Sequence, residues 1–249
     1  MITIDTLLNM MNCYPSGECP YLKDRKENIR ALRCPMLPNE LHLGLIERGF
    51  RHSGDIFYTP ECDNCKQCKS MRIKVEDFKP TKKQRHIFNK NKDITFQLTV
   101  PALSDEIYDI YKRYMEFQHS DSNQGHERSD LESFLYQPFP SAAQILYMLE
   151  NRIVGVTIVD IIPYKALSSV YHFFDPIYAR RSIGVFSVIS EIYLCLCTGI
   201  PYYYLGYWVP GCKKMQYKAN YQPNELLING EWVRNPYLDT NDAISNDSI

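Results

Sequence analysis

One stretch near the C-terminus, residues 166–222, constrains the fold more than any other part of the chain. Residues 168–174 are rich in β-branched and aromatic side chains and predict a strand. Apolar residues then recur at helical spacing between Ser182 and Gly199, and residues 202–208 predict a second strand. A strand, a helix and a strand in this order predict a right-handed crossover that places the two strands parallel in one sheet.

The residues before this stretch predict more of the same sheet. A strand, two helices and two further strands precede the crossover, at residues 94–100, 103–118, 126–135, 144–149 and 153–162. We therefore predict an α+β fold in which a mixed sheet is flanked by helices. The order of its elements is that of the acetyltransferase-like (GNAT) fold.

Three regions follow from this pattern. Residues 1–92 form an irregular N-terminal region that contains a cysteine loop between short strands and ends in a basic run. Residues 93–235 form the regular GNAT-like domain. Residues 236–249 are polar and mildly acidic, which predicts a disordered tail.

The composition limits the binding partners and the cellular location that we expect for this protein. The formal net charge is −1, so no global field attracts nucleic acid, and any RNA contact needs a local basic patch. No run approaches the roughly 20 apolar residues of a membrane span, and no secretory signal is evident. Nine cysteines, an odd number, then favour reduced thiols over disulfides. We expect a cytoplasmic protein that binds neither membrane nor DNA.

Several ordered motifs resemble one enzyme family. The most specific lie after the second strand, at Tyr204-Leu205-Gly206-Tyr207-Trp208, Cys212, Lys214-Met215, Tyr217-Lys218 and Tyr221-x-Pro223. Others precede them, at Cys19-Pro20-Tyr21-Leu22, Gly49-Phe50-Arg51-His52-Ser53-Gly54, Tyr58-x-Pro60-x-Cys62 and Arg181-Ser182-Ile183-Gly184. Across residues 15–232 the chain resembles the arginyl-tRNA–protein transferases, and in particular their bacterial aspartate/glutamate leucyltransferase branch.

The resemblance implies transfer of an amino acid from charged tRNA to the N-terminal amine of proteins that begin with Asp or Glu, which marks them for N-degron proteolysis. Leucine is the expected amino acid, whereas an arginyl donor would need a buried carboxylate, for which Asp160, Asp175 and Glu191 are available. The ester is already activated and the acceptor amine has a pKa near ~7.7–8, so the enzyme mainly positions its substrates. We expect no required cofactor and no covalent intermediate.

Candidate catalytic residues lie on the central strands or just after them. Asp160 or Asp175, or the ribose hydroxyl of the tRNA itself, would accept the proton, and backbone N–H groups together with Tyr207 or Lys214 would stabilise the oxyanion of the tetrahedral intermediate. Tyr171 completes the set, because ligands bind near the C-terminal ends of strands in open α/β sheets. The alternative interpretation is that the tyrosines pack in the core and that Asp175 belongs to a turn.

Three further groups are expected to bind the substrates. Arginine pairs a carboxylate bidentately, so the acidic acceptor side chain is expected at Arg51, His52, Arg72 and Lys74. Contacts to tRNA phosphates are expected at Lys82, Lys83, Arg85, Arg180, Arg181 and Lys218, although a basic run is also typical of a solvated face. An apolar pocket for a leucyl side chain is expected from Phe173, Phe174, Phe186 and Ile189.

The cysteine loop has metal-ligand spacing at Cys62-x-x-Cys65-x-x-Cys68, and Cys19 is a candidate fourth ligand for zinc or an iron–sulfur cluster. Eukaryotic family members pair two cysteines near the N-terminus, but here Leu22 stands where the second would be. Buried reduced thiols are therefore the favoured interpretation.

Two other classes of protein stay open. An acetyl-CoA-dependent acetyltransferase would share the fold, and a non-catalytic adaptor would bind metal or RNA through the cysteine loop. Within the family, an arginyl donor or a broader acceptor range stays open, because residues 118–123 depart from the usual pattern of the bacterial branch.

Overall fold

The predicted crossover is present and forms the centre of the structure. The computed structural model describes residues 2–118 and 127–238. β9 (Ala166–Phe174), α6 (Ile183–Thr198) and β10 (Tyr202–Trp208) follow one another, and the two strands pair in parallel. Gly199 ends α6 in the left-handed conformation, with φ of 69°. This glycine provides the sharp exit that turns the chain back into the sheet.

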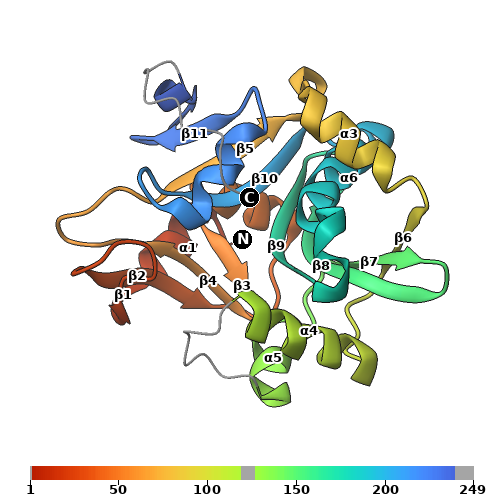
Figure 1. Cartoon of the computed structure of the whole chain (residues 1–249). Coiled ribbons are helices and arrows are strands. Elements are labelled where there is room, and N and C mark those ends of the chain that lie inside the picture. Colours follow the sequence, from red (N-terminus) through yellow and green to blue (C-terminus); the bar gives the residue numbers. More distant parts are fainter. Residues whose placement is uncertain (1, 119–126, 239–249) are drawn as a thin grey trace.

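Eight strands form one mixed sheet, in the order β12-β11-β5-β10-β9-β8-β7-β6 (Figure 1). The three strands predicted before the crossover are present, namely β6 (Ile94–Thr99), β7 (Ala142–Leu149) and β8 (Arg152–Ile162), and they pair antiparallel. Three more lie beyond β10, namely β5 (Lys69–Lys74), β11 (Glu225–Ile228) and β12 (Glu231–Arg234). The prediction of an α+β fold with a large mixed sheet is confirmed.

The strands beyond β10 differ from the prediction. Asn229 and Gly230 have φ of 52° and 85°, and they form the two-residue turn between β11 and β12. β5 comes from the N-terminal region, yet it pairs antiparallel with both β10 and β11. The large sheet therefore crosses the boundary that we predicted at residue 92.

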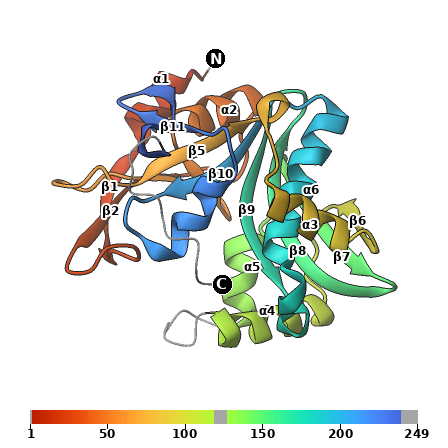
Figure 2. The same ribbon diagram turned by 45° about the horizontal axis from the view of Figure 1, so that its top comes forward.

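A second, four-stranded sheet lies beside the large one and belongs to the N-terminal region (Figures 1 and 2). Its order is β1-β2-β4-β3, with bounds Asn12–Glu18, Lys26–Arg33, Ile56–Pro60 and Arg51–Ser53. α1 (Ile4–Met10) and α2 (Asn39–Glu47) supply apolar side chains to a core around Phe57. The N-terminal region is therefore more regular than we predicted.

Helices cover both faces of the large sheet and enclose two apolar cores (Figure 2). α3 (Lys82–Lys90) and α6 cover one face, whereas α4 (Asp105–Gln118) and α5 (Arg128–Leu135) cover the other. Among the helices of the described residues, none combines the length and apolar character needed to cross a bilayer.

Short 3-10 segments complete the fold: η1 (Val75–Asp77), η2 (Pro176–Arg181), η3 (Lys213–Asn220) and η4 (Pro236–Leu238). The last of these begins the segment that we predicted to be disordered, and the remainder of that segment, 239–249, lies outside the described residues.

A buried carboxylate ties α6 to the large sheet. Glu191 Oε1 accepts hydrogen bonds from Tyr147 and Thr157, both at 2.9 Å, and Oε2 accepts one from Tyr203 at 2.7 Å. Burial raises the pKa of Glu191, although the hydroxyl donors act in the opposite direction. Three strands, β7, β8 and β10, are thus fixed to one helix through a single side chain.

We expect Glu191→Ala to destabilise the protein by about 3–5 kcal/mol, because three buried hydroxyls lose the acceptor that they share and a cavity opens in the core. Urea unfolding at neutral pH measures the change. Ser190→Ala is the matched control, since the Ser190 hydroxyl is buried with no hydrogen-bond partner among the described residues. Its removal should change stability by less than about 0.5 kcal/mol. Equal unfolding midpoints for the two variants would contradict this account.

Candidate active site

β9 and β10 pair over three residues and then separate. Their parallel ladder runs from Tyr202 opposite Ala166 to Tyr204 opposite Ser168. β10 then has a bulge before Gly206, while β9 continues along β8. The sheet therefore opens at the C-terminal ends of two parallel strands, where ligands bind in open α/β sheets.

The guanidinium of Arg51, from β3 of the small sheet, fills this gap. Its Nη2 donates to the carbonyls of Ser169 and Val170, at 2.8 and 3.1 Å. Gly206, with φ of 78°, makes room for it, because a Cβ there would lie 2.7 Å from Nη1 of Arg51. Nη1 itself is buried and has no hydrogen-bond partner among the described residues. One edge of the guanidinium is therefore available to a carboxylate or phosphate.

Lys218, on η3, lies within electrostatic reach of Arg51. Its Nζ donates to the carbonyl of Tyr207 at 2.8 Å. The pKa of Lys218 is lowered to about 7, mainly by burial and secondly by the positive charge of Arg51. The structure therefore places Lys218 beside the separated strands, away from the exposed basic residues with which we grouped it.

Three of the predicted catalytic residues lie apart from one another. The Tyr207 hydroxyl is buried and donates to the carbonyl of Gly49 at 2.9 Å. The Tyr171 hydroxyl contacts the sulfur of Met115 at 3.7 Å, on the α4 face. Lys214 is exposed on η3. Burial raises the pKa of both tyrosines. Their roles stay predictions, and catalysis by Tyr207 would first require its bond to Gly49 to break.

Asp175 joins the end of β9 to η2 and α4. Its Oδ1 accepts a hydrogen bond from the amide of Ile177 at 3.2 Å, and its Oδ2 pairs with Arg113 at 2.7 Å. The carboxylate is buried, so these partners compensate its charge. Arg113 was not singled out from the sequence, because its spacing on α4 marks it only as a surface position.

Asp160 lies at the centre of a buried polar network. Its Oδ2 is 3.2 Å from Nδ1 of His52, and its Oδ1 accepts a hydrogen bond from Ser141 at 3.0 Å. The Ser141 hydroxyl also lies 2.9 Å from Nδ1 of His42. Burial acts to raise the pKa of Asp160, but its hydrogen bonds and the nearby histidines outweigh burial and lower it.

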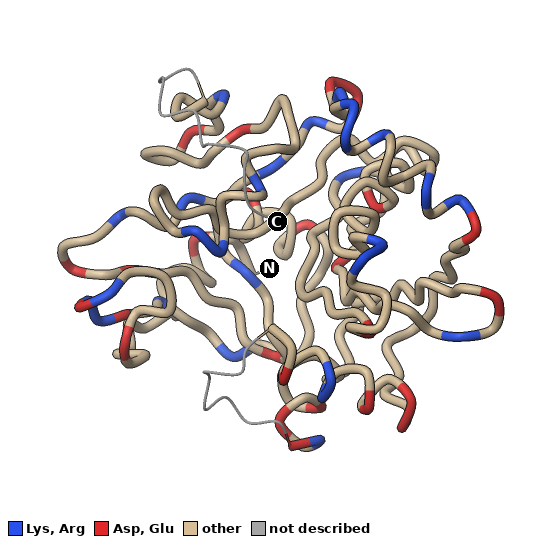
Figure 3. Tube along the Cα trace, in the orientation of Figure 1, with Lys and Arg blue, Asp and Glu red and all other residues tan. Residues whose placement is uncertain are grey.

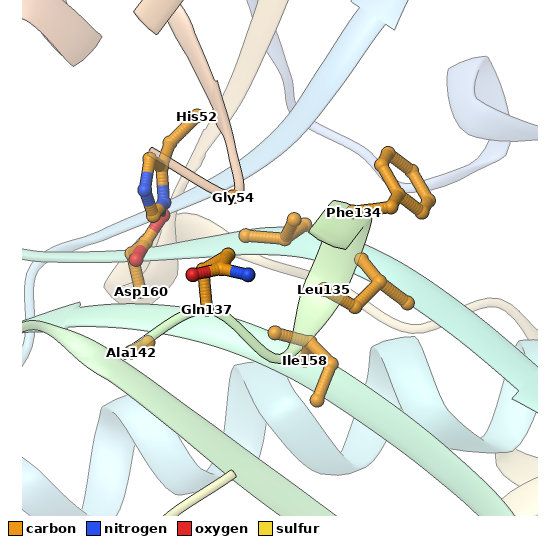
Figure 4. Close-up of a pocket in the computed structure, with 9 residues that line it drawn as sticks. His52, Gly54, Phe134, Leu135, Gln137, Ala142, Ile158 and Asp160 are labelled. Carbon is orange, nitrogen blue, oxygen red and sulfur yellow. Dashed lines mark hydrogen bonds and ion pairs between the residues drawn. The ribbon is translucent and has the colours of Figure 1, made fainter. Parts of the chain in front are cut away.

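His52 and Asp160 close one end of a small pocket (Figure 4). The other walls are mostly apolar and include Phe134, Leu135, Ala142, Ile158 and Val170. Because Arg51 binds the carbonyl of Val170, this pocket adjoins the separated strands. His52, which we predicted to bind the acceptor, therefore belongs to the pocket and to the Asp160 network.

The other predicted acceptor-binding residues have partners elsewhere. Arg72 Nε donates to Glu225 at 2.6 Å, and its guanidinium is stacked between two aromatic rings. Lys74 pairs with a carboxylate of η1 at 2.6 Å. Of the predicted set, Arg51 is the residue that lies where the strands separate.

Two segments predicted to bind tRNA, α3 and the residues around Arg180, lie next to each other. α3 exposes Lys82, Lys83 and Arg85, and basic residues recur along this helix (Figure 3). Lys90, at its end, donates from Nζ to the carbonyl of the exposed Arg180 at 2.8 Å. Arg181 instead packs beneath the helix, where it donates to Asn91 at 2.9 Å and pairs with Asp93. Thr81 and Gln84 form the capping box that starts α3, a local signal that would have predicted the helix.

The residues predicted to form a donor pocket lie in two cores. Phe173 packs with α4 and α5, whereas Phe186 and Ile189 pack with α3 on the opposite face. Phe174 lies at the edge of the latter core. The structure therefore does not bring these four side chains around one cavity.

The cysteines of the loop lie close enough to influence one another. Burial, followed by the charges of Cys19, Cys65 and Cys62, raises the pKa of the Cys68 thiol to about 12. Cys62 instead hydrogen-bonds the backbone of Asn28, at 3.5 and 3.7 Å. Within residues 2–118 and 127–238, no three Cys, His, Asp or Glu side chains are arranged to hold a metal ion. The described geometry thus does not provide a ligand set for zinc or a cluster.

Comparison with known proteins gives the class of this chain. Residues 17–86 match the family model "Arginine-tRNA-protein transferase, N terminus", and residues 106–228 match "Arginine-tRNA-protein transferase, C terminus". The chain belongs to this family, and it is an aminoacyltransferase that uses charged tRNA to modify protein N-termini.

Similar proteins from Pseudomonas fluorescens, Pseudomonas entomophila and Pseudomonas putida are named aspartate/glutamate leucyltransferase. Each is 38% identical over 218 residues, covering 86% of this chain and 92% of the relative. Among solved structures, that of L-PGS from Bacillus licheniformis gives a TM-score of 0.45 at 14% identity over 57% of this chain and 47% of that chain. Of residues 118–123, where the sequence departs from the bacterial pattern, 119–123 lie outside the described residues.

We expect the protein to lose stability as the pH falls from about 6.5 towards 4. Burial lowers the pKa of His42 to about 4, against the opposing charge of Asp160, so the folded state resists a proton that the unfolded chain takes up. His42→Gln should reduce the slope of unfolding free energy against pH by about 1.4 kcal/mol per pH unit in this window.

Urea unfolding at several pH values measures the slope. His86→Gln is the control, because His86 is exposed on α3 and its loss should leave the slope unchanged. A His42→Gln variant with the parent slope would show that His42 takes up its proton without resistance in the folded state.

Proposed function

We propose that this enzyme transfers leucine from Leu-tRNA to proteins that begin with Asp or Glu, and thereby marks them for proteolysis in the cytoplasm. Leucine is favoured over arginine because the buried carboxylates that could bind an arginyl side chain already have hydrogen-bond partners within the protein. Asp160, Asp175 and Glu191, the candidates to hold an arginyl donor, already accept hydrogen bonds from histidine, serine, arginine, threonine or tyrosine side chains. The names of the Pseudomonas relatives support the same donor and acceptors.

Arg51 is the residue proposed to bind the acidic side chain of the acceptor. Its Nη1 is unpartnered, and its Nη2 is fixed by two carbonyls, so the guanidinium is held in place before substrate arrives. A preorganised arginine loses little entropy on binding a carboxylate. Arg72 and Lys74 already pair with carboxylates of the chain, which favours Arg51 for this role.

The finer fold assignment, a GNAT-like transferase domain, rests on topology. Three antiparallel strands lead into a parallel pair that separates beyond a bulge. In this proposal the aminoacyl ester enters at the separated strands and the acceptor amine attacks it directly. The ester is already activated, so no cofactor is required. A bound zinc ion or cluster would have no part in these steps.

The test offers labelled Leu-tRNA, Phe-tRNA and Arg-tRNA against peptides that begin with Asp, Glu, Lys, Arg or Ala. We expect transfer from Leu-tRNA to the Asp and Glu peptides. Arg51→Lys, which keeps the charge but loses the planar fork, should raise KM for these peptides about tenfold or more, at unchanged affinity for charged tRNA. Transfer from Arg-tRNA in preference to Leu-tRNA would overturn the donor, and equal use of Ala peptides would overturn the acceptor.

We propose α3 as the surface that binds the tRNA backbone. Neutralising Lys82, Lys83 and Arg85 together should weaken binding for every charged tRNA alike. It should also flatten the dependence of log K on log salt by about 0.7–0.9 for each phosphate contact removed. The matched control neutralises three exposed cations near the β1–β2 turn, Lys23, Arg25 and Lys26. If both triple variants change the slope equally, net charge and not the α3 surface explains binding.

A further inference from the structure

We propose that Lys218 is the proton acceptor of the transfer reaction: its Nζ takes a proton from the attacking amine and returns it to the leaving ribose oxygen. This inference rests on the proposed function for its substrates. It begins from the position of Lys218, whose Nζ is held 2.8 Å from the carbonyl of Tyr207 near the end of β10. That end is where β9 and β10 have separated and where the free edge of Arg51 lies.

The charges around Lys218 favour its neutral amine. The groups that act on it are the guanidinium of Arg51, from β3, and the thiol of Cys212, from the turn before η3. No carboxylate of the described residues is among them. A partly buried lysine beside another cation and without a carboxylate has a lowered pKa, here about 7. Such a lysine is the usual form in which this side chain acts as a base.

The other groups near the site are less suited to this step. Asp160 accepts hydrogen bonds on both oxygens, and Asp175 is paired with Arg113. The hydroxyl of Tyr207 is committed to Gly49. A neutral Lys218 can donate one hydrogen to the Tyr207 carbonyl and keep its lone pair free.

The chemistry balances without another reactant. The neutral acceptor amine attacks the ester carbonyl carbon, forming a C–N bond and a tetrahedral intermediate with positive nitrogen and negative oxygen. Lys218 removes one N–H proton from this nitrogen. The C–O bond to ribose then breaks with its electron pair on the ribose oxygen, and the lysine ammonium protonates that oxygen. The products are an amide and a free ribose hydroxyl, and Lys218 is neutral again.

Single-turnover transfer at saturating charged tRNA between pH 5.5 and 7 tests the inference. The parent needs both a neutral acceptor amine and a neutral Lys218, so log rate should rise with a slope approaching two against pH. Lys218→Met should reduce the rate at pH 7.5 by about 100-fold or more and lower this slope to about one. Lys213→Met, an exposed lysine at the start of the same 3-10 segment, should match the parent in both.

Lys218→Gln, which keeps an N–H donor but has no basic amine, separates the chemical role from a structural one and should show the same loss of slope. In the parent protein, acylation of Lys218 by a small anhydride, followed by mass spectrometry, should titrate near pH 7. This measurement needs no variant to fold.

An unchanged slope in both Lys218 variants, or labelling of Lys218 that titrates like an ordinary lysine near ~10.4, would overturn the inference. Weaker tRNA binding with an unchanged saturating rate would show a phosphate contact instead. If the parent prefers another donor, the proposed leucyl specificity fails, and the same slopes measured with that donor still decide the role of Lys218.

Discussion

The candidate site depends on the guanidinium of Arg51, which lies where β9 and β10 separate. Separating β9 from β10 leaves carbonyls on β9 without their ladder partner, and an unpaired buried carbonyl is costly. Arg51 meets this need with charge-assisted hydrogen bonds to Ser169 and Val170, and Gly206 gives it room. Because Arg51 comes from the small sheet, the N-terminal region contributes directly to the candidate site.

Among the described residues, the buried carboxylates Asp160, Asp175 and Glu191 all have hydrogen-bond partners, whereas Nη1 of Arg51 has none. Glu191 is surrounded by hydroxyl donors, and Asp160 by two histidines and a serine. Such satisfied networks fix the packing of helices and sheets and leave no charge for a ligand. Arg51 and Lys218 share a small region without a carboxylate between them. The unpaired edge of Arg51 is best completed by an anionic group of the substrate, whereas Lys218 is favoured as a neutral amine.

Local patterns predicted the crossover and the three strands before it, because helix and strand periodicity are carried by neighbouring residues. Two local signals, Asn229-Gly230 and the Thr81–Gln84 capping box, were present in the sequence but were not used. The position of β5 and the insertion of Arg51 could not be predicted in this way, since both depend on pairing between distant segments. His42 shows the same limit, because it lies on the apolar face of α2 and only the fold reveals Ser141 beside it.

The place of β5 also has a consequence for how the protein is made. β5 is synthesised early, but both strands that flank it, β10 and β11, leave the ribosome more than a hundred residues later. Its backbone groups and the buried Met71 and Ile73 must wait for these partners. Such long-range pairing slows folding and leaves an exposed strand in the nascent chain. The enzyme is therefore expected to become active only after synthesis is nearly complete, and to be a natural client of chaperones until then.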